Sequence, residues 1–130
     1  MTQICGLEIS LNLCNTMLNC CERNGRGDLA YHLMRSMHDN GIIGESITYN
    51  MILSALGKSN DASIVPFMME VYNTMKFCGI RITGYTCSVL AKACDKFNDP
   101  QTMVYLNQEF QQLGFEWDAN TKTYVQARRY

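Results

Sequence analysis

The chain has 130 residues, of which 47% are hydrophobic and 18% are charged, and its formal net charge is -1. This composition excludes a disordered chain, and the length is that of one domain with a substantial core. No apolar run approaches the roughly 18 residues of a membrane span, so we expect no membrane-spanning segment. The near-neutral charge provides no overall field that would attract nucleic acid. The first residues lack the pattern of a signal peptide or a basic amphipathic presequence.

The seven cysteines do not have the spacing of a disulfide or metal set. Their number is odd, no Cys-x-x-Cys occurs, and the chain has no Asn-x-Ser/Thr sequon. Four of them fall on the apolar helix faces described below, namely Cys14, Cys21, Cys87 and Cys94. The sequence therefore predicts buried free thiols, a reducing compartment and no metal site.

Helical periodicity begins after a weakly patterned lead-in, residues 1–10, which is either the remnant of an earlier helix or a docking strap. The first hairpin, residues 11–45, has two apolar faces with helical spacing. They comprise Cys14, Met17, Leu18 and Cys21, then Ala30, Leu33, Met34 and Met37. The composition of residues 24–27 predicts the turn, Asp28 is placed to cap the second helix, and Gly41 to end it.

The second hairpin, residues 46–83, has the clearest pattern. Its faces comprise Tyr49, Ile52, Leu53 and Leu56, then Met68, Val71, Tyr72 and Met75, with Gly79 at the expected C-cap. Because proline is tolerated in the first turn of a helix, Pro66 predicts that the second helix begins there. We therefore place a three-residue insertion in the turn, within residues 60–65.

The third hairpin, residues 84–118, repeats the pattern. Its faces comprise Cys87, Leu90, Ala91 and Cys94, then Met103, Leu106, Asn107 and Phe110. Asp99 and Pro100 form a predicted cap, and Gly114 ends the last helix. Residues 119–130 start like a further helix but lose the apolar phase, so we expect a capping helix or a tail.

The closing glycines give the repeat length. Gly41 and Gly79 are 38 residues apart, Gly79 and Gly114 are 35 apart, and the insertion accounts for the difference. Because the apolar positions superpose in all three repeats, with Asn107 as the only polar exception, the sequence predicts an all-α protein. Its fold class is a short α-α superhelical solenoid of helical hairpins.

The repeats resemble those of the pentatricopeptide repeat family. The best matches are Ile47-Thr48-Tyr49-Asn50-Met51-Ile52-Leu53 and the helix ends Met37–Ile42 and Met75–Ile80. Residues 113–118 resemble the repeat end, with Trp117 where proline is usual. The resemblance covers residues 11–118, and the 35-residue spacing favours this family over tetratricopeptide repeats, which have 34.

The resemblance implies binding of single-stranded RNA in an organelle, a mitochondrion or a chloroplast, at one base per repeat. Two side chains in each repeat would recognise the base, and the matching positions here are Asn15 with Glu45, Asn50 with Thr83, and Ser88 with Asp118. Residues that flank the base in the family correspond to Asn12, Ile47 and Tyr85, of which Asn12 departs from the usual aliphatic pattern.

Two functions stay open on the sequence. Three repeats and a slightly acidic chain favour a small scaffold subunit of a larger organellar assembly, whereas family membership favours RNA. A basic strip at the first-helix ends is possible, formed by Arg23, Arg26, Lys58, Lys92 and Lys96.

No catalytic constellation is predicted, and we expect neither an enzyme nor a cofactor or small-molecule substrate. Gly25-x-Gly27-x-x-Ala30 follows a helix instead of a strand, which identifies it as a turn and not a dinucleotide loop. His32 and His38 lie on different helix faces and are expected at the surface or its edge. We expect the ring of Trp117 to be buried between the third repeat and the tail.

Overall fold

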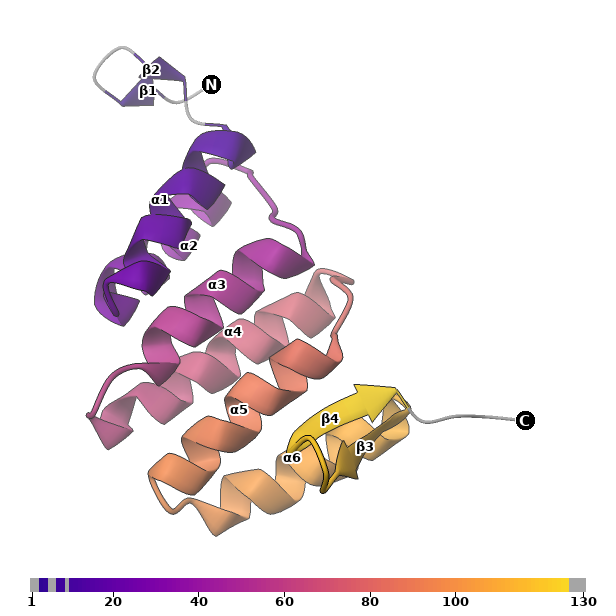
Figure 1. The fold of residues 1–130 in the computed structure, drawn as a ribbon. Coiled ribbons are helices and arrows are strands. Elements are labelled where there is room, and N and C mark those ends of the chain that lie inside the picture. Colours follow the sequence, from indigo (N-terminus) through magenta and orange to yellow (C-terminus); the bar gives the residue numbers. More distant parts are fainter. Residues whose placement is uncertain (1–2, 5–6, 9, 127–130) are drawn as a thin grey trace. The chain divides into compact units, whose positions relative to one another are not determined.

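The computed structural model describes residues 3–4, 7–8 and 10–126 (Figure 1). These residues form six α-helices, one short 3-10 helix and four short strands. The chain divides into two compact units, residues 1–81 and residues 82–130. The first unit holds four helices, and the second holds two helices and a β-hairpin.

The first unit contains two helical hairpins. Its helices are α1 (Leu11–Arg23), α2 (Gly27–Asp39), α3 (Ser46–Gly57) and α4 (Val65–Phe77), with the 3-10 turn η1 (Ala62–Ile64) before α4. The turn η1 occupies the place predicted for the insertion, and Pro66 lies in the first turn of α4 as predicted. In the lead-in, β1 (Gln3–Ile4) and β2 (Leu7–Glu8) pair antiparallel, and its residues 1–2, 5–6 and 9 lie outside the described part.

The core of the first unit follows the predicted helix faces. All eight predicted apolar positions of α3 and α4 are buried, and so are Cys14, Leu18 and Cys21 of α1. Two predicted positions of this unit are exceptions: Met17 of α1 is 41% exposed, and Leu33 of α2 is half-buried. Leu13, which is also in α1, is 39% exposed.

The ends of α2 and α4 explain the spacing of the glycines. Gly41 and Gly79 adopt φ angles of 74° and 72°, which glycine reaches without steric cost. The following amides, of Ile42 and Ile80, donate to carbonyls five residues earlier, each at 2.8 Å, in the Schellman arrangement. Asp28 does not cap α2 as predicted, because α2 begins one residue earlier, at Gly27, and the Asp28 carboxylate pairs with Arg26 instead.

The second unit packs a β-hairpin on a helix pair. Its elements are α5 (Gly84–Lys96), α6 (Pro100–Gln112), β3 (Phe115–Asp118) and β4 (Thr123–Gln126). The Asp99 side chain accepts the Thr102 amide, so the predicted cap is confirmed. The ring of Tyr124 packs edge-on against Phe110 with centroids 4.9 Å apart, and both rings are buried.

Residues 119–126 form no helix, in contrast to one of the two expectations for this segment. Strands β3 and β4 pair antiparallel, with Trp117 opposite Tyr124 and Asp118 opposite Thr123. The turn is closed by the Lys122 amide, which donates to the Asp118 carbonyl at 2.7 Å, and by the Asn120 amide, which donates to the Asp118 carboxylate. This local closure, together with burial of Tyr124, outweighs a helical pattern whose apolar phase is poor.

Candidate nucleic-acid interface

Helices α1 and α3 are adjacent in the first unit and carry residues at corresponding repeat positions. Asn12 and Asn15 lie one turn apart in α1, and Ile47 and Asn50 lie one turn apart in α3, which packs beside α1. Asn12 and Ile47 are exposed, Ile47 by 62%, whereas Asn15 and Asn50 are half-buried. The repeat register thus places matched polar and flanking side chains on two adjacent helices.

Thr48 links the predicted pair Asn15 and Glu45. Its hydroxyl donates to the Asn15 amide oxygen at 2.8 Å and accepts the Glu45 backbone amide at 3.0 Å, while Thr48 itself is fully buried. This bridge fixes the Asn15 carboxamide in one orientation. Its NH₂ group makes no hydrogen bond among the described residues, and the Glu45 side chain is exposed. The sequence analysis missed this role of Thr48, although its position at the third residue of a helix is typical of a capping partner.

Tyr49 holds the turn that carries Glu45. Its hydroxyl accepts the Gly44 amide at 3.1 Å and lies 2.9 Å from Nε2 of His38. Burial raises the pKa of Tyr49 and lowers the pKa of His38, in each case by disfavouring the charged form. His38 is half-buried, which agrees with the edge position predicted for it.

In the second unit, the C-terminal hairpin covers the predicted base-recognition residue Ser88. The Ser88 hydroxyl donates to the Gly84 carbonyl at 2.9 Å and accepts the Tyr124 backbone amide at 3.1 Å. Only 7% of Ser88 is exposed. Recognition of a base by this hydroxyl therefore requires displacement of β4.

The remaining predicted residues differ in their surroundings. Tyr85 is 52% exposed on the first turn of α5. Thr83 caps α5, since its hydroxyl accepts the Thr86 amide. The half-buried Asp118 uses its carboxylate to close the β3–β4 turn. Because Asn50 and Thr83 belong to different compact units, their pairing stays a prediction.

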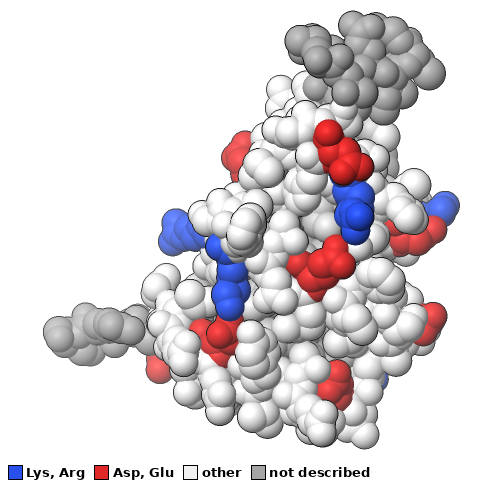
Figure 2. All heavy atoms as spheres, turned by 180° about the vertical axis from the view of Figure 1, so that it is seen from behind, with Lys and Arg blue, Asp and Glu red and all other residues white. Residues whose placement is uncertain are grey.

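Charge is dispersed over the surface. Arg26 of the predicted basic strip pairs with Asp28 at 3.2 Å, Lys58 donates to the Glu22 carbonyl, and Lys96 lies over the Phe97 ring. On the face shown in Figure 2, acidic and basic side chains are interspersed over a largely uncharged surface. Three members of the strip thus have local partners, so the strip is not a continuous set of free cations.

The buried thiols are unsuited to ligand chemistry at neutral pH. Burial raises the pKa of Cys87 to about 12 and that of Cys94 to about 11, and it also raises the pKa of Cys14 and of Cys21. No group of three potential metal-ligating side chains occurs within residues 3–4, 7–8 and 10–126. In the same described part of the chain, every helix falls short of the length and hydrophobicity that a bilayer crossing requires.

One family model matches the first part of the chain. The family model described as "PPR repeat family" matches residues 11–60, which include all of α1, α2 and α3. No curated protein sequence matches the chain significantly.

Among solved structures, the fold is similar to that of the pentatricopeptide repeat protein PPR10 in complex with an 18-nt psaJ RNA element. The TM-score is 0.72 with 22% sequence identity, over 85% of this chain and 16% of that chain. A variant of the same protein with three cysteines replaced by serine, also in complex with the psaJ element, matches with the same values. The predicted all-α solenoid fold of helical hairpins is thereby confirmed, and this chain spans about one sixth of the structures it matches.

Proposed function

Because residues 11–60 match the pentatricopeptide repeat family model and the fold is similar to that of PPR10, we propose that this chain binds single-stranded RNA through the α1–α3 surface of its first unit. The observation that carries the proposal is the Asn15–Thr48–Glu45 link, in which one buried hydroxyl contacts both the Asn15 side chain and the Glu45 backbone amide. The RNA-bound state of the structurally similar PPR10 supports it.

The chemistry of the first repeat suits a base edge. The Asn15 amide offers N–H donors, and the exposed Glu45 carboxylate offers acceptors. Together they complement a base edge that carries both a hydrogen-bond acceptor and a hydrogen-bond donor. The exposed Ile47 side chain gives the base an apolar contact. In the second repeat, the half-buried Asn50 would contact the next base.

The third repeat contributes differently in this proposal. Since β4 covers Ser88, recognition by Ser88 and Asp118 follows only when the hairpin moves. The chain alone would then hold about two bases, at one per repeat, so its own affinity is low. An organellar location, in a mitochondrion or chloroplast, is part of the proposal and follows from the family resemblance.

The test is fluorescence anisotropy of a labelled random single-stranded RNA, titrated with the chain at low and at physiological salt. Binding should weaken with salt, because phosphate contacts release counterions. The Asn15→Ala/Asn50→Ala variant should bind more weakly, whereas Asn73→Ala, an exposed asparagine on α4, should bind as the wild type does. RNA binding that is equal in all three proteins would refute the assigned surface, and absence of binding at low salt would refute the function.

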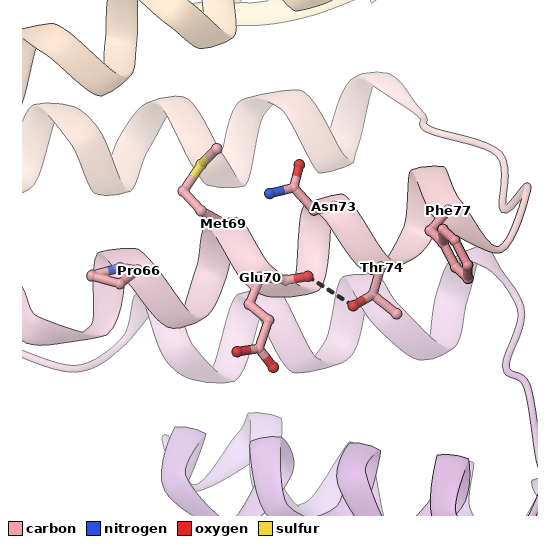
Figure 3. A pocket seen from close by; sticks show the side chains of 6 residues that line it. All are labelled: Pro66, Met69, Glu70, Asn73, Thr74 and Phe77. Carbon is pink, nitrogen blue, oxygen red and sulfur yellow. Dashed lines mark hydrogen bonds between the residues drawn. The ribbon is translucent and has the colours of Figure 1, made fainter.

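A scaffold role is the alternative, and one observation favours it. Phe77 is 92% exposed at the end of α4, and the outer face of this helix forms a shallow pocket of about 580 Å³ that also includes Pro66 and Met69 (Figure 3). A largely exposed aromatic ring is typical of protein contacts. If RNA binding fails, this face is where a protein partner should be sought, with Phe77→Ala as the test variant.

A further inference from the structure

A second candidate site lies entirely within the second unit. The hairpin, the second half of α5 and the beginning of α6 enclose a pocket of about 440 Å³, within the ~300–1,000 Å³ typical of small-ligand sites. It is lined by Lys92, Asp95, Met103, Trp117, Lys122 and Tyr124.

The indole of Trp117 is one of the two aromatic side chains that line this pocket. The sequence analysis expected this ring to be buried, but 51% of it is exposed. The reason is that Tyr124, directly opposite on β4, takes the buried place beside Phe110. Trp117 packs edge-on against the Tyr124 ring, at 5.3 Å between centroids and 67° between planes. A large aromatic side chain is thus held in place by a buried neighbour while half of it stays available to a ligand.

Two lysines flank the indole. Lys92 of α5 and Lys122 of the hairpin turn are both exposed, and neither ammonium has an ion pair or hydrogen bond within the described part of the chain. Lys122 also adopts a φ of 56°, a conformation that asparagine or glycine adopts more easily. The lining therefore carries two cations against one carboxylate, Asp95, in a chain whose net charge is -1.

We propose that this pocket binds one nucleotide of single-stranded RNA, with the base stacked on Trp117 and the phosphate beside Lys92 and Lys122. Aromatic stacking combined with a lysine-lined path for the backbone is how proteins hold single strands without a base code. Asp95 adds a preference, because a carboxylate accepts two N–H groups from guanine but only one from uracil. The inference rests on the proposed function, since it assigns a second contact to the same class of ligand.

The decisive measurement uses Trp117 itself, because it is the only tryptophan of the chain. The full chain is titrated with GMP, with UMP and with a short single-stranded RNA, and the tryptophan emission is recorded with correction for nucleotide absorbance. We expect saturable quenching, stronger for GMP than for UMP. Lys92→Ala/Lys122→Ala should weaken it, whereas Lys76→Ala/Arg81→Ala, which removes the same charge from the first unit, should not.

Anisotropy with labelled RNA provides the second readout. Trp117→Ala should lower RNA affinity about 5- to 150-fold, and Trp117→Phe should restore much of it. Loss of both lysine contacts to this phosphate should reduce the slope of log K against log salt by about 0.7.

These experiments distinguish failure of the Trp117 pocket from failure of RNA binding at the α1–α3 surface. Quenching that persists in Asn15→Ala/Asn50→Ala supports the pocket even if the α1–α3 surface proves inactive. Absence of saturable quenching by every probe, or equal quenching in both double-charge variants, overturns the pocket and leaves the α1–α3 surface to its own test.

Discussion

Replacement of Gly84 by alanine should displace the C-terminal hairpin from α5. A Cβ at this position would lie 2.5 Å from the Tyr124 carbonyl oxygen, and ordinary contact begins near 3.4 Å, so β4 must move away by about 0.9 Å. A shift of this size would lengthen the 3.1 Å hydrogen bond from the Tyr124 amide to Ser88 beyond bonding distance. The substitution therefore acts on a backbone contact that a flexible side chain cannot relieve.

The change in unfolding free energy caused by Gly84→Ala is the sum of opposing effects. Overpacking costs about 1–3 kcal/mol, and the lost hydrogen bond costs about 1 kcal/mol. Replacing glycine in a helix returns at most about 1 kcal/mol, and less at the first residue. We expect a net loss of about 1–3 kcal/mol in the unfolding free energy of the second unit.

Urea unfolding followed by Trp117 emission measures this loss, because Trp117 lies in the hairpin. Gly84→Ala should shift the emission to longer wavelength and lower the midpoint. Gly27→Ala is the matched control, since its Cβ would lie 2.7 Å from the Leu56 Cα in the first unit and should leave the Trp117 emission unchanged. An unaltered emission spectrum and midpoint in Gly84→Ala would refute the close packing of β4 on α5.

Three further predictions concern stability and reactivity. The pKa of His38 is lower in the folded than in the unfolded chain, so stability should be full above about pH 6.5 and fall below it, and His38→Gln should flatten the pH dependence of the urea midpoint. In a thiol titration at pH 8, Cys20→Ser should remove one fast-reacting thiol, because Cys20 is exposed. Cys87→Ser should remove none, because the Cys87 thiol is buried and has a pKa of about 12. Fast reaction of Cys87 would contradict its burial. Thermal melting should show that Phe110→Ala lowers the unfolding free energy by about 3–5 kcal/mol, because this ring is fully buried. Phe77→Ala should change the unfolding free energy by no more than about 0.5 kcal/mol, because Phe77 is 92% exposed.

The sequence alone determined the six helices and most of their buried positions. Period, caps and closing glycines are local signals that point to the same elements, as the buried Tyr49 and Tyr72 and the left-handed Gly41 and Gly79 show. The same repeat register indicated which positions on α1 and α3 are equivalent, because equal spacing along equal helices gives equal places on adjacent helices.

Only the tertiary structure decided what surrounds those positions. The bridge from Thr48 to Asn15 spans 33 residues, and the hydrogen bond from Tyr124 to Ser88 spans 36, so neither contact has a signature in local periodicity. The hairpin itself arises because burial of Tyr124 against Phe110 competes with a weak helical preference, and that competition depends on the finished helix pair. The same packing leaves Trp117 half exposed, since only one of two facing aromatic side chains can occupy the space between α5 and α6.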